Sequence, residues 1–130
     1  MSKKDIQSRA DIQLMVDEFY KKVIADELIG HFFNNVVKLD WEKHIPIMYD
    51  FWESMLLQKN VYRGNPMQAH LDLNSKSPLK EKHFNRWLNL FEATVDELFI
   101  GQNADTAKTR ALSIATIIQA KLMTQNPEQI

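Results

Sequence analysis

The chain has 130 residues, of which 45% are apolar and 25% are charged, as is typical of one soluble globular domain. The 16 Lys and Arg residues nearly balance the 17 Asp and Glu residues, so no basic excess is available for binding nucleic acid or a membrane surface. The absence of cysteine excludes disulfides, thiolate zinc sites and cysteine nucleophiles. No apolar run resembles a signal peptide or approaches membrane-spanning length, and we expect a single cytoplasmic domain over residues 1–130.

Helical periodicity dominates the sequence, which only three glycines and four prolines interrupt. We expect the first long helix to begin at Ser8, with Asp11 completing an approximate capping box. Tyr20 lies at the edge of its apolar face. Asp26 can cap a short helix that follows. The apolar face of the long helix consists of Ile12, Met15, Val16, Phe19 and Val23.

A second long helix is expected over residues 41–57. His44 continues its apolar stripe one turn before Met48. Pro46 leaves two alternatives open, because proline lacks a backbone N–H and is comfortable only in the first turn of a helix. Either the regular helix begins near Ile45 and leaves His44 outside it, or the helix is bent there. The stripe consists of Trp41, Ile45, Met48, Phe51, Trp52 and Met55.

The segment between the second and third long helices contains a candidate metal ligand. Gly64-Asn65-Pro66 is a turn signal, and Asn65 can cap a short helix that ends near His70. A histidine held in this way between two apolar helices can direct one ring nitrogen at a metal. The alternative is that His70 is simply an exposed loop residue.

Two further helices complete the chain. Ser77-Pro78 is predicted to open the third, which runs to about residue 100 and stops at Gly101. Asn103 is expected to cap the last helix, which runs to about Thr124. The stripe of the third helix consists of Phe84, Trp87, Leu88, Phe91, Val95 and Leu98, and the inward face of the last consists of Leu112, Ala115, Ile118 and Leu122. The result is an all-α domain with a core over about residues 8–124.

Common catalytic motifs are missing from the sequence, including the His-Glu-x-x-His zinc helix, the Gly-x-Ser-x-Gly elbow and the phosphate loop. The polar residues on the apolar stripes also have structural interpretations: His44 as a hydrogen-bonded boundary residue, Tyr20 as a core-edge tyrosine and Trp87 as packing. A bound cofactor that needs one strong axial ligand and an apolar slot explains the pattern better than a polar enzyme site.

Taken in order, these segments resemble the truncated haemoglobins, and most of all their third subgroup. No single segment is specific, but the ordered set with its spacings is. The chain also lacks the Gly-Gly pairs that other subgroups carry. The resemblance covers about residues 8–122 and rests on Phe19-Tyr20, the run 31–35, Trp41-Glu-Lys-His44, Phe51-Trp52, Tyr62-Arg-Gly64, His70-Leu-Asp-Leu73 and the run 83–91.

The resemblance implies a truncated globin-like 2-over-2 helical sandwich around a haem pocket. It implies haem b, with His70 as the proximal iron ligand and Tyr20, His44 and Trp87 as distal residues. Hydroxyl and indole N–H groups are donors that stabilise a partly anionic ligand in a low dielectric. The apolar walls are expected from Phe19, Phe32, Phe33, Met48, Phe51, Trp52 and Phe91, with Arg63 and Lys59 near the haem propionates.

The function implied is reversible binding of O2, NO and CO, with nitric oxide dioxygenation or peroxide chemistry as further reactions and an unidentified reductase as partner. A monomer is expected, since no apolar heptad seam remains once the core is assigned. Several distal donors would slow ligand release, which suits a reactor or sensor better than a carrier. Two alternatives stay open. One is a dedicated haem peroxidase, although no distal arginine accompanies His44 in the matching segments. The other is a haem-free helical interaction module.

Overall fold

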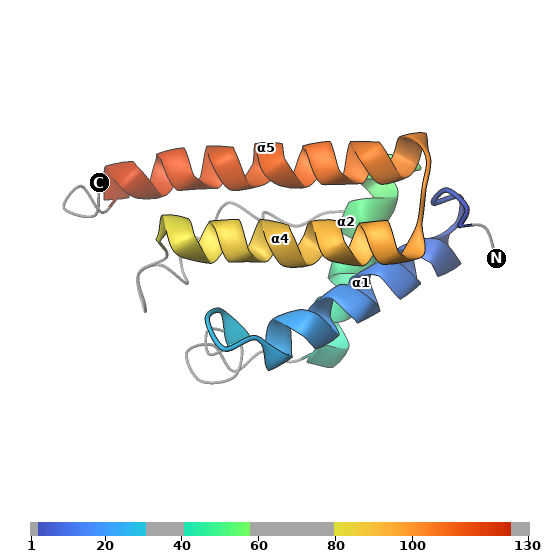
Figure 1. Ribbon diagram of the computed structural model, residues 1–130, viewed down its shortest axis with the longest axis horizontal. Helices are drawn as coiled ribbons and strands as arrows, with labels where there is room; N and C mark the ends of the chain where they lie inside the picture. The colour runs from blue at the N-terminus through green and yellow to red at the C-terminus, as the bar shows by residue number, and fades with distance from the viewer. Residues whose placement is uncertain (1–2, 31–40, 58–79, 126–130) are drawn as a thin grey trace.

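The computed structural model describes residues 3–30, 41–57 and 80–125. Four long helices fill most of these ranges: α1 (Arg9–Ala25), α2 (Trp41–Leu56), α4 (Glu81–Leu98) and α5 (Gln102–Gln125). α4 and α5 form an antiparallel pair, and α1 and α2 cross that pair obliquely (Figure 1). The predicted all-α architecture of two crossed helix pairs is therefore confirmed. No helix within the described ranges combines the length and apolar character needed to span a membrane.

α1 forms largely as predicted. Ser8 is its N-cap, and its hydroxyl accepts a hydrogen bond from the Asp11 backbone N–H at 3.4 Å. The Asp11 carboxylate accepts from Gln7 N at 2.9 Å, so the predicted capping box is displaced by one residue. The whole predicted apolar face is buried, and Tyr20 is half-buried at its edge. Asp26 accepts from the backbone N–H groups of the next turn at 3.0 and 3.1 Å.

α2 settles the alternatives that Pro46 left open. The helix begins at Trp41 and contains both His44 and Pro46, so the alternative in which the helix begins near Ile45 is wrong. Trp52 is buried on the predicted stripe, and Leu56 is buried beside it. The partly buried members of the stripe that pack against the core are Ile45, Met48, Phe51 and Met55.

α4 begins at Glu81, later than the predicted opening at Ser77-Pro78, a pair that lies outside the described residues. Lys80 is its N-cap, and the Lys80 backbone N–H donates to Nδ1 of His83 at 2.9 Å. This bond satisfies a backbone donor at the helix start and places His83 inward, where it is buried. The predicted apolar stripe is confirmed, with Trp87 and Leu98 partly buried and the other four residues buried.

Two predictions about α5 are wrong. Asn103 lies inside the helix, and its side chain donates to the Ile6 carbonyl oxygen at 2.7 Å. Leu112 is 52% exposed and faces outward. The buried face consists mainly of small residues, which allow α5 to pack closely against α4: Ala104, Ala107, Ala111, Ala115 and Ile118.

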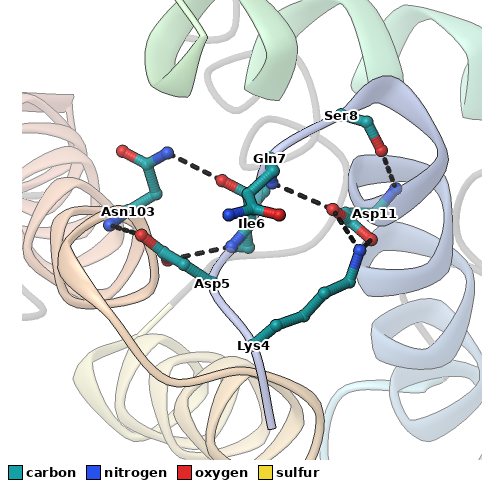
Figure 2. Close-up of polar contacts among 7 residues, drawn as sticks. All are labelled: Lys4, Asp5, Ile6, Gln7, Ser8, Asp11 and Asn103. Carbon is teal, nitrogen blue, oxygen red and sulfur yellow. Dashed lines mark hydrogen bonds and ion pairs between the residues drawn. The ribbon is translucent and has the colours of Figure 1, made fainter.

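The segment before Ser8 was not predicted to be structured, yet it contacts the α4–α5 connection and the start of α5 (Figure 2). Ile100 N donates to the Lys4 carbonyl oxygen at 3.0 Å, and Ile6 is fully buried. The Asp5 carboxylate accepts from the backbone N–H groups of Asn103 and Ala104, each at 2.9 Å. Asp5 therefore caps the start of α5 from the opposite end of the sequence.

Candidate functional site

Six aromatic side chains from three helices form a continuous series of ring contacts, which we call the aromatic network. α1 contributes two of them, α2 contributes two and α4 contributes two. The members are Phe19, Tyr20, Phe51, Trp52, Trp87 and Phe91. Five of them were predicted site residues that are separated widely in sequence, and the sixth, Phe19, was expected in the apolar wall.

Phe91 is at the centre of the aromatic network. Its ring stacks on that of Trp52, with centroids 4.9 Å apart and planes 18° apart. It also stacks on Trp87, with centroids 5.8 Å apart and planes 9° apart. Phe19 meets both Phe91 and Trp87 edge to face, at 5.2 and 5.6 Å. Offset stacks and edge-to-face pairs are the favourable aromatic geometries, so the four rings define one another's orientation.

The two ends of the aromatic network are less buried than its centre. Tyr20 contacts Phe19 with ring centroids 5.2 Å apart, and Phe51 contacts Trp52 at the same distance. Tyr20, Phe51 and Trp87 are half-buried, whereas the other three members are buried. Successive residues of a helix point about 100° apart, which is why Phe19 enters the core while Tyr20 stays at its boundary.

Burial raises the pKa of the Tyr20 hydroxyl above its ordinary value of 10.0. The phenol therefore keeps its proton at neutral pH, and its O–H group is a hydrogen-bond donor by its chemistry. Trp87 carries an indole N–H, which is a donor only. The described part of the site thus offers two neutral donors on an otherwise aromatic surface.

Salt bridges outside the aromatic network hold its three helices together. Arg9 on α1 binds two carboxylates of α2, Asp50 at 3.0 Å and Glu53 at 2.7 Å. Arg86 on α4 binds Asp26 beyond the end of α1 at 2.7 Å. These pairs join residues 41 to 60 positions apart, and nothing in the local sequence pattern indicated them.

The remaining predicted site residues are described only in part. Met48 lies on α2 one turn before Trp52 and packs against the core. His44 lies within α2, but its side chain is outside the described residues. The predicted iron ligand His70 is also outside them, together with Phe33 and Arg63, and with Phe32 and Lys59. Among the described side chains, no group of three or more His, Asp or Glu residues could hold a metal ion.

Comparison with known proteins identifies the fold. The chain matches the sequence profile of the bacterial-like globin family over residues 4–120. The chain belongs to this family. It is 31% identical to the group 3 truncated haemoglobin of Campylobacter jejuni over 118 residues, which are 88% of this chain and 91% of that protein. The predicted membership of the truncated haemoglobins, in their third group, is thereby confirmed.

Solved structures support the same assignment. The crystal structure of the group III truncated haemoglobin from Campylobacter jejuni matches with a TM-score of 0.80 at 30% identity, covering 93% of this chain and 95% of that one. The 2/2 haemoglobin from Synechococcus sp. PCC 7002, solved in the cyanomet state with covalently attached haem, matches with a TM-score of 0.67 at 28% identity, covering 88% and 86%. The 2-over-2 globin fold is therefore shown.

Membership of the globin family supports haem-based gas binding. The chemistry of the described residues fits a haem group, because aromatic and thioether side chains suit the faces of a broad apolar macrocycle. Half-buried Met48 and Phe51 provide such apolar surface, and half-buried Tyr20 and Trp87 combine it with O–H and N–H donors. A haem site needs this combination, since a polar ligand is bound inside an apolar slot.

Proposed function

We propose that the protein binds haem b through His70 and uses the bound haem to take up O2, NO and CO reversibly, with Tyr20, His44 and Trp87 as the distal residues. The observation that carries the proposal is the aromatic network, because it brings Tyr20 of α1 and Trp87 of α4 against the same phenylalanine, Phe19. Family membership supports the cofactor, and the donor chemistry of these two side chains supports the kind of ligand.

When bound, haem supplies the iron at which a diatomic gas binds. The contribution of the protein is to orient donors and to exclude water. Tyr20 offers a hydroxyl whose raised pKa keeps it protonated, and Trp87 offers its indole N–H. Hydrogen bonds from such donors to a partly charged ligand are stronger in a low-dielectric site than in water.

The apolar residues divide into two groups by burial. Half-buried Met48 and Phe51 are proposed contacts of the haem faces. Outside the described residues, Phe33 is a further proposed contact and Arg63 is a proposed partner of the propionates. Trp52 and Phe91 were predicted as further contacts, but both are buried beneath the half-buried residues. We propose that Trp52 and Phe91 hold the half-buried aromatic side chains in place by packing against them. Direct contact of these two residues with haem stays a prediction.

The first experiment is the visible absorption spectrum of the protein supplied with haem, recorded in ferric, ferrous and carbon monoxide forms. We expect a stoichiometric Soret band that shifts with carbon monoxide. The His70→Ala variant should lose this spectrum, because the iron would lose its axial ligand. His31→Ala, which removes a histidine without a predicted role, should retain it. If neither wild type nor His70→Ala takes up haem, the interaction-module alternative replaces this proposal.

We further propose that the protein is a monomer and that an unidentified reductase supports any nitric oxide dioxygenation. The spread of exposed large apolar side chains along the chain supports the monomer. In the described ranges, two of them lie on α1, one on α2, one in the α4–α5 connection and two on α5. Sedimentation velocity of the haem-loaded protein tests this proposal, and a concentration-dependent dimer would contradict it. Steady-state consumption of nitric oxide with and without added reductase tests turnover.

A further inference from the structure

We propose that Phe91 is a positioning residue for Trp87, fixing the plane of the indole and hence the direction in which its N–H points. This inference rests on the proposed role of Trp87 as a distal donor. It gives Phe91 a role other than the haem contact predicted from sequence. With only 1% of its surface exposed, Phe91 is surrounded by packed side chains, and the haem contact stays a separate prediction.

The ring of Phe91 lies in contact with two tryptophan rings, Trp87 and Trp52, and is nearly parallel to both. Phe91 and Trp87 lie one turn apart on α4, where side chains four positions apart are neighbours, and their planes differ by only 9°. Trp52 of α2 stacks on the same phenylalanine, with planes 18° apart. Within the part of the chain that the structure describes, the two indoles make no direct ring contact, so Trp52 reaches Trp87 through Phe91.

Phe19 of α1 contacts the same two rings of α4, Trp87 and Phe91. It meets Trp87 at an interplanar angle of 86° and Phe91 at 85°, so it contacts both rings edge to face. The plane of Trp87 is thereby set by one ring parallel to it and another perpendicular to it. Both of these neighbours are buried, whereas Trp87 itself is half-buried. The buried rings of Phe19 and Phe91 are therefore held in place by packing, and the orientation of Trp87 follows from its contacts with them.

Orientation matters for an indole more than for a hydroxyl. The indole has a single N–H, whose direction is fixed in the plane of the ring. The outer torsion of a tryptophan side chain is broad, so packing must select its value. A hydrogen bond weakens steeply as its angle departs from linearity. If the ring plane rotates, the donor loses its ligand even though Trp87 is still present.

The test is a double-mutant cycle on the haem-loaded protein, with the oxygen dissociation rate as the first readout. The four proteins are the wild type, Trp87→Phe, Phe91→Leu and the double variant. Trp87→Phe should accelerate dissociation by about tenfold, the size of one hydrogen bond to a charged group. Phe91→Leu should accelerate it several-fold in the wild type and leave it nearly unchanged in the Trp87→Phe background, because residues that act through one another are non-additive.

The matched control is Phe99→Leu, which makes the same change at a phenylalanine that is 4% exposed and has no ring contact in the described part of the chain. It should cost stability without changing the dissociation rate. A second readout is the C–O stretching band of the carbon monoxide complex. This band senses the direction of a nearby donor and should shift in Phe91→Leu but not in Phe99→Leu. If Phe91→Leu does not fold, Phe91→Met, which keeps more of the side-chain volume, takes its place.

The outcomes separate the two proposals. If Trp87→Phe leaves the rate and the C–O band unchanged, the donor role of Trp87 is wrong, and the positioning role of Phe91 is overturned with it. If Trp87→Phe accelerates dissociation but Phe91→Leu behaves like Phe99→Leu, only the positioning role is overturned. An equal acceleration by Phe91→Leu in both backgrounds would show that it acts by a route other than Trp87.

Discussion

At the residue scale, the adjacent residues Phe19 and Tyr20 have different surroundings, because successive side chains of a helix point about 100° apart. Phe19 is buried and contacts three other members of the aromatic network, whereas Tyr20 keeps part of its side chain exposed. Burial of its hydroxyl raises the pKa of Tyr20, so this group stays neutral over the whole physiological range. A neutral hydroxyl on a ring that packs against Phe19 has the donor chemistry that the proposed distal role of Tyr20 requires.

Replacing Tyr20 by Phe should accelerate oxygen dissociation from the haem-loaded protein by about tenfold, since it removes one hydrogen bond to a charged ligand and leaves the ring. Stopped-flow displacement of oxygen by carbon monoxide measures the rate. The control is Tyr49→Phe, which removes a hydroxyl that donates to the Asp17 carboxylate between α2 and α1 and should leave the rate unchanged. An unchanged or slower rate in Tyr20→Phe would count against the donor role.

The sequence predicted which aromatic residues share a face but not how their rings meet. Spacings of three and four placed Phe19, Trp52 and Phe91 on inward stripes, because helical periodicity is a local property. Ring orientation depends on how α1, α2 and α4 cross, and no local pattern encodes that crossing. The contact between Trp52 and Phe91 could therefore be found only in the folded chain.

At the element scale, α5 shows that the larger of two adjacent apolar residues is not always the buried one. Leu112 was predicted to face inward, yet the adjacent Ala111 is fully buried and Leu112 is exposed. Four alanines of α5 recur at spacings of three and four on its buried face, and α5 packs against α4: Ala104, Ala107, Ala111 and Ala115. Where two helices approach closely, only a small side chain fits between them. Burial at such a position cannot be predicted from the hydrophobicity of the side chain alone.

The adjacent pair provides a matched test of this packing. Ala111→Leu should destabilise the protein by about 1–3 kcal/mol, because added methylenes in a filled interface force neighbouring groups apart. Leu112→Ala should change the free energy of unfolding by about 0.5 kcal/mol or less, as expected at a surface position. Urea unfolding of both variants measures the difference. The reverse order, with Leu112→Ala the more harmful, would mean that Leu112 and not Ala111 faces the core.

The capping of α5 by Asp5 could not be predicted from local sequence either, because the capping residue and the helix are about 100 residues apart (Figure 2). Gly101 makes the approach feasible. Its φ is +143°, and a Cβ there would lie 2.4 Å from Cγ of Asp5. Burial of the carboxylate opposes ionisation, but hydrogen bonds from the backbone N–H groups of Asn103 and Ala104 outweigh it and lower the pKa of Asp5 below its ordinary 3.8.

Asp5→Ala should therefore cost about 1 kcal/mol at neutral pH, the usual loss for a helix cap. The lowered pKa fixes the sign of the pH dependence, since the folded state binds this proton more weakly than the unfolded state. The contribution is fully present above pH 3.8 and is lost as the pH falls through the folded pKa. The difference between wild type and variant in urea unfolding should shrink in strong acid. A difference that stays constant would indicate that packing, and not the charge, is responsible.

At the scale of the whole molecule, the aromatic network depends on the complete fold, because its members come from three helices that the Arg9 and Arg86 salt bridges join. Periodicity predicted these helices individually, and the resemblance to truncated haemoglobins supplied their crossed arrangement, which local patterns could not. The salt bridges and the N-terminal segment were missed, because partners far apart in sequence leave no local signal. The salt bridges connect α1 with α2 and α4, and the N-terminal segment contacts the start of α5.

This dependence predicts how haem should affect stability. Since the three helices must be assembled before their aromatic surface exists, haem should bind the folded chain far more tightly than the unfolded one. Binding of this kind stabilises by mass action, by about 4 kcal/mol when free haem exceeds its dissociation constant a thousandfold. The thermal midpoint of the wild type should therefore rise with haem, and that of His70→Ala should rise much less. Phe99→Leu should lower the midpoint of the haem-free and haem-loaded proteins, yet the increment due to haem should remain. Equal increments in the wild type and His70→Ala would show that haem binds without an axial bond from this histidine.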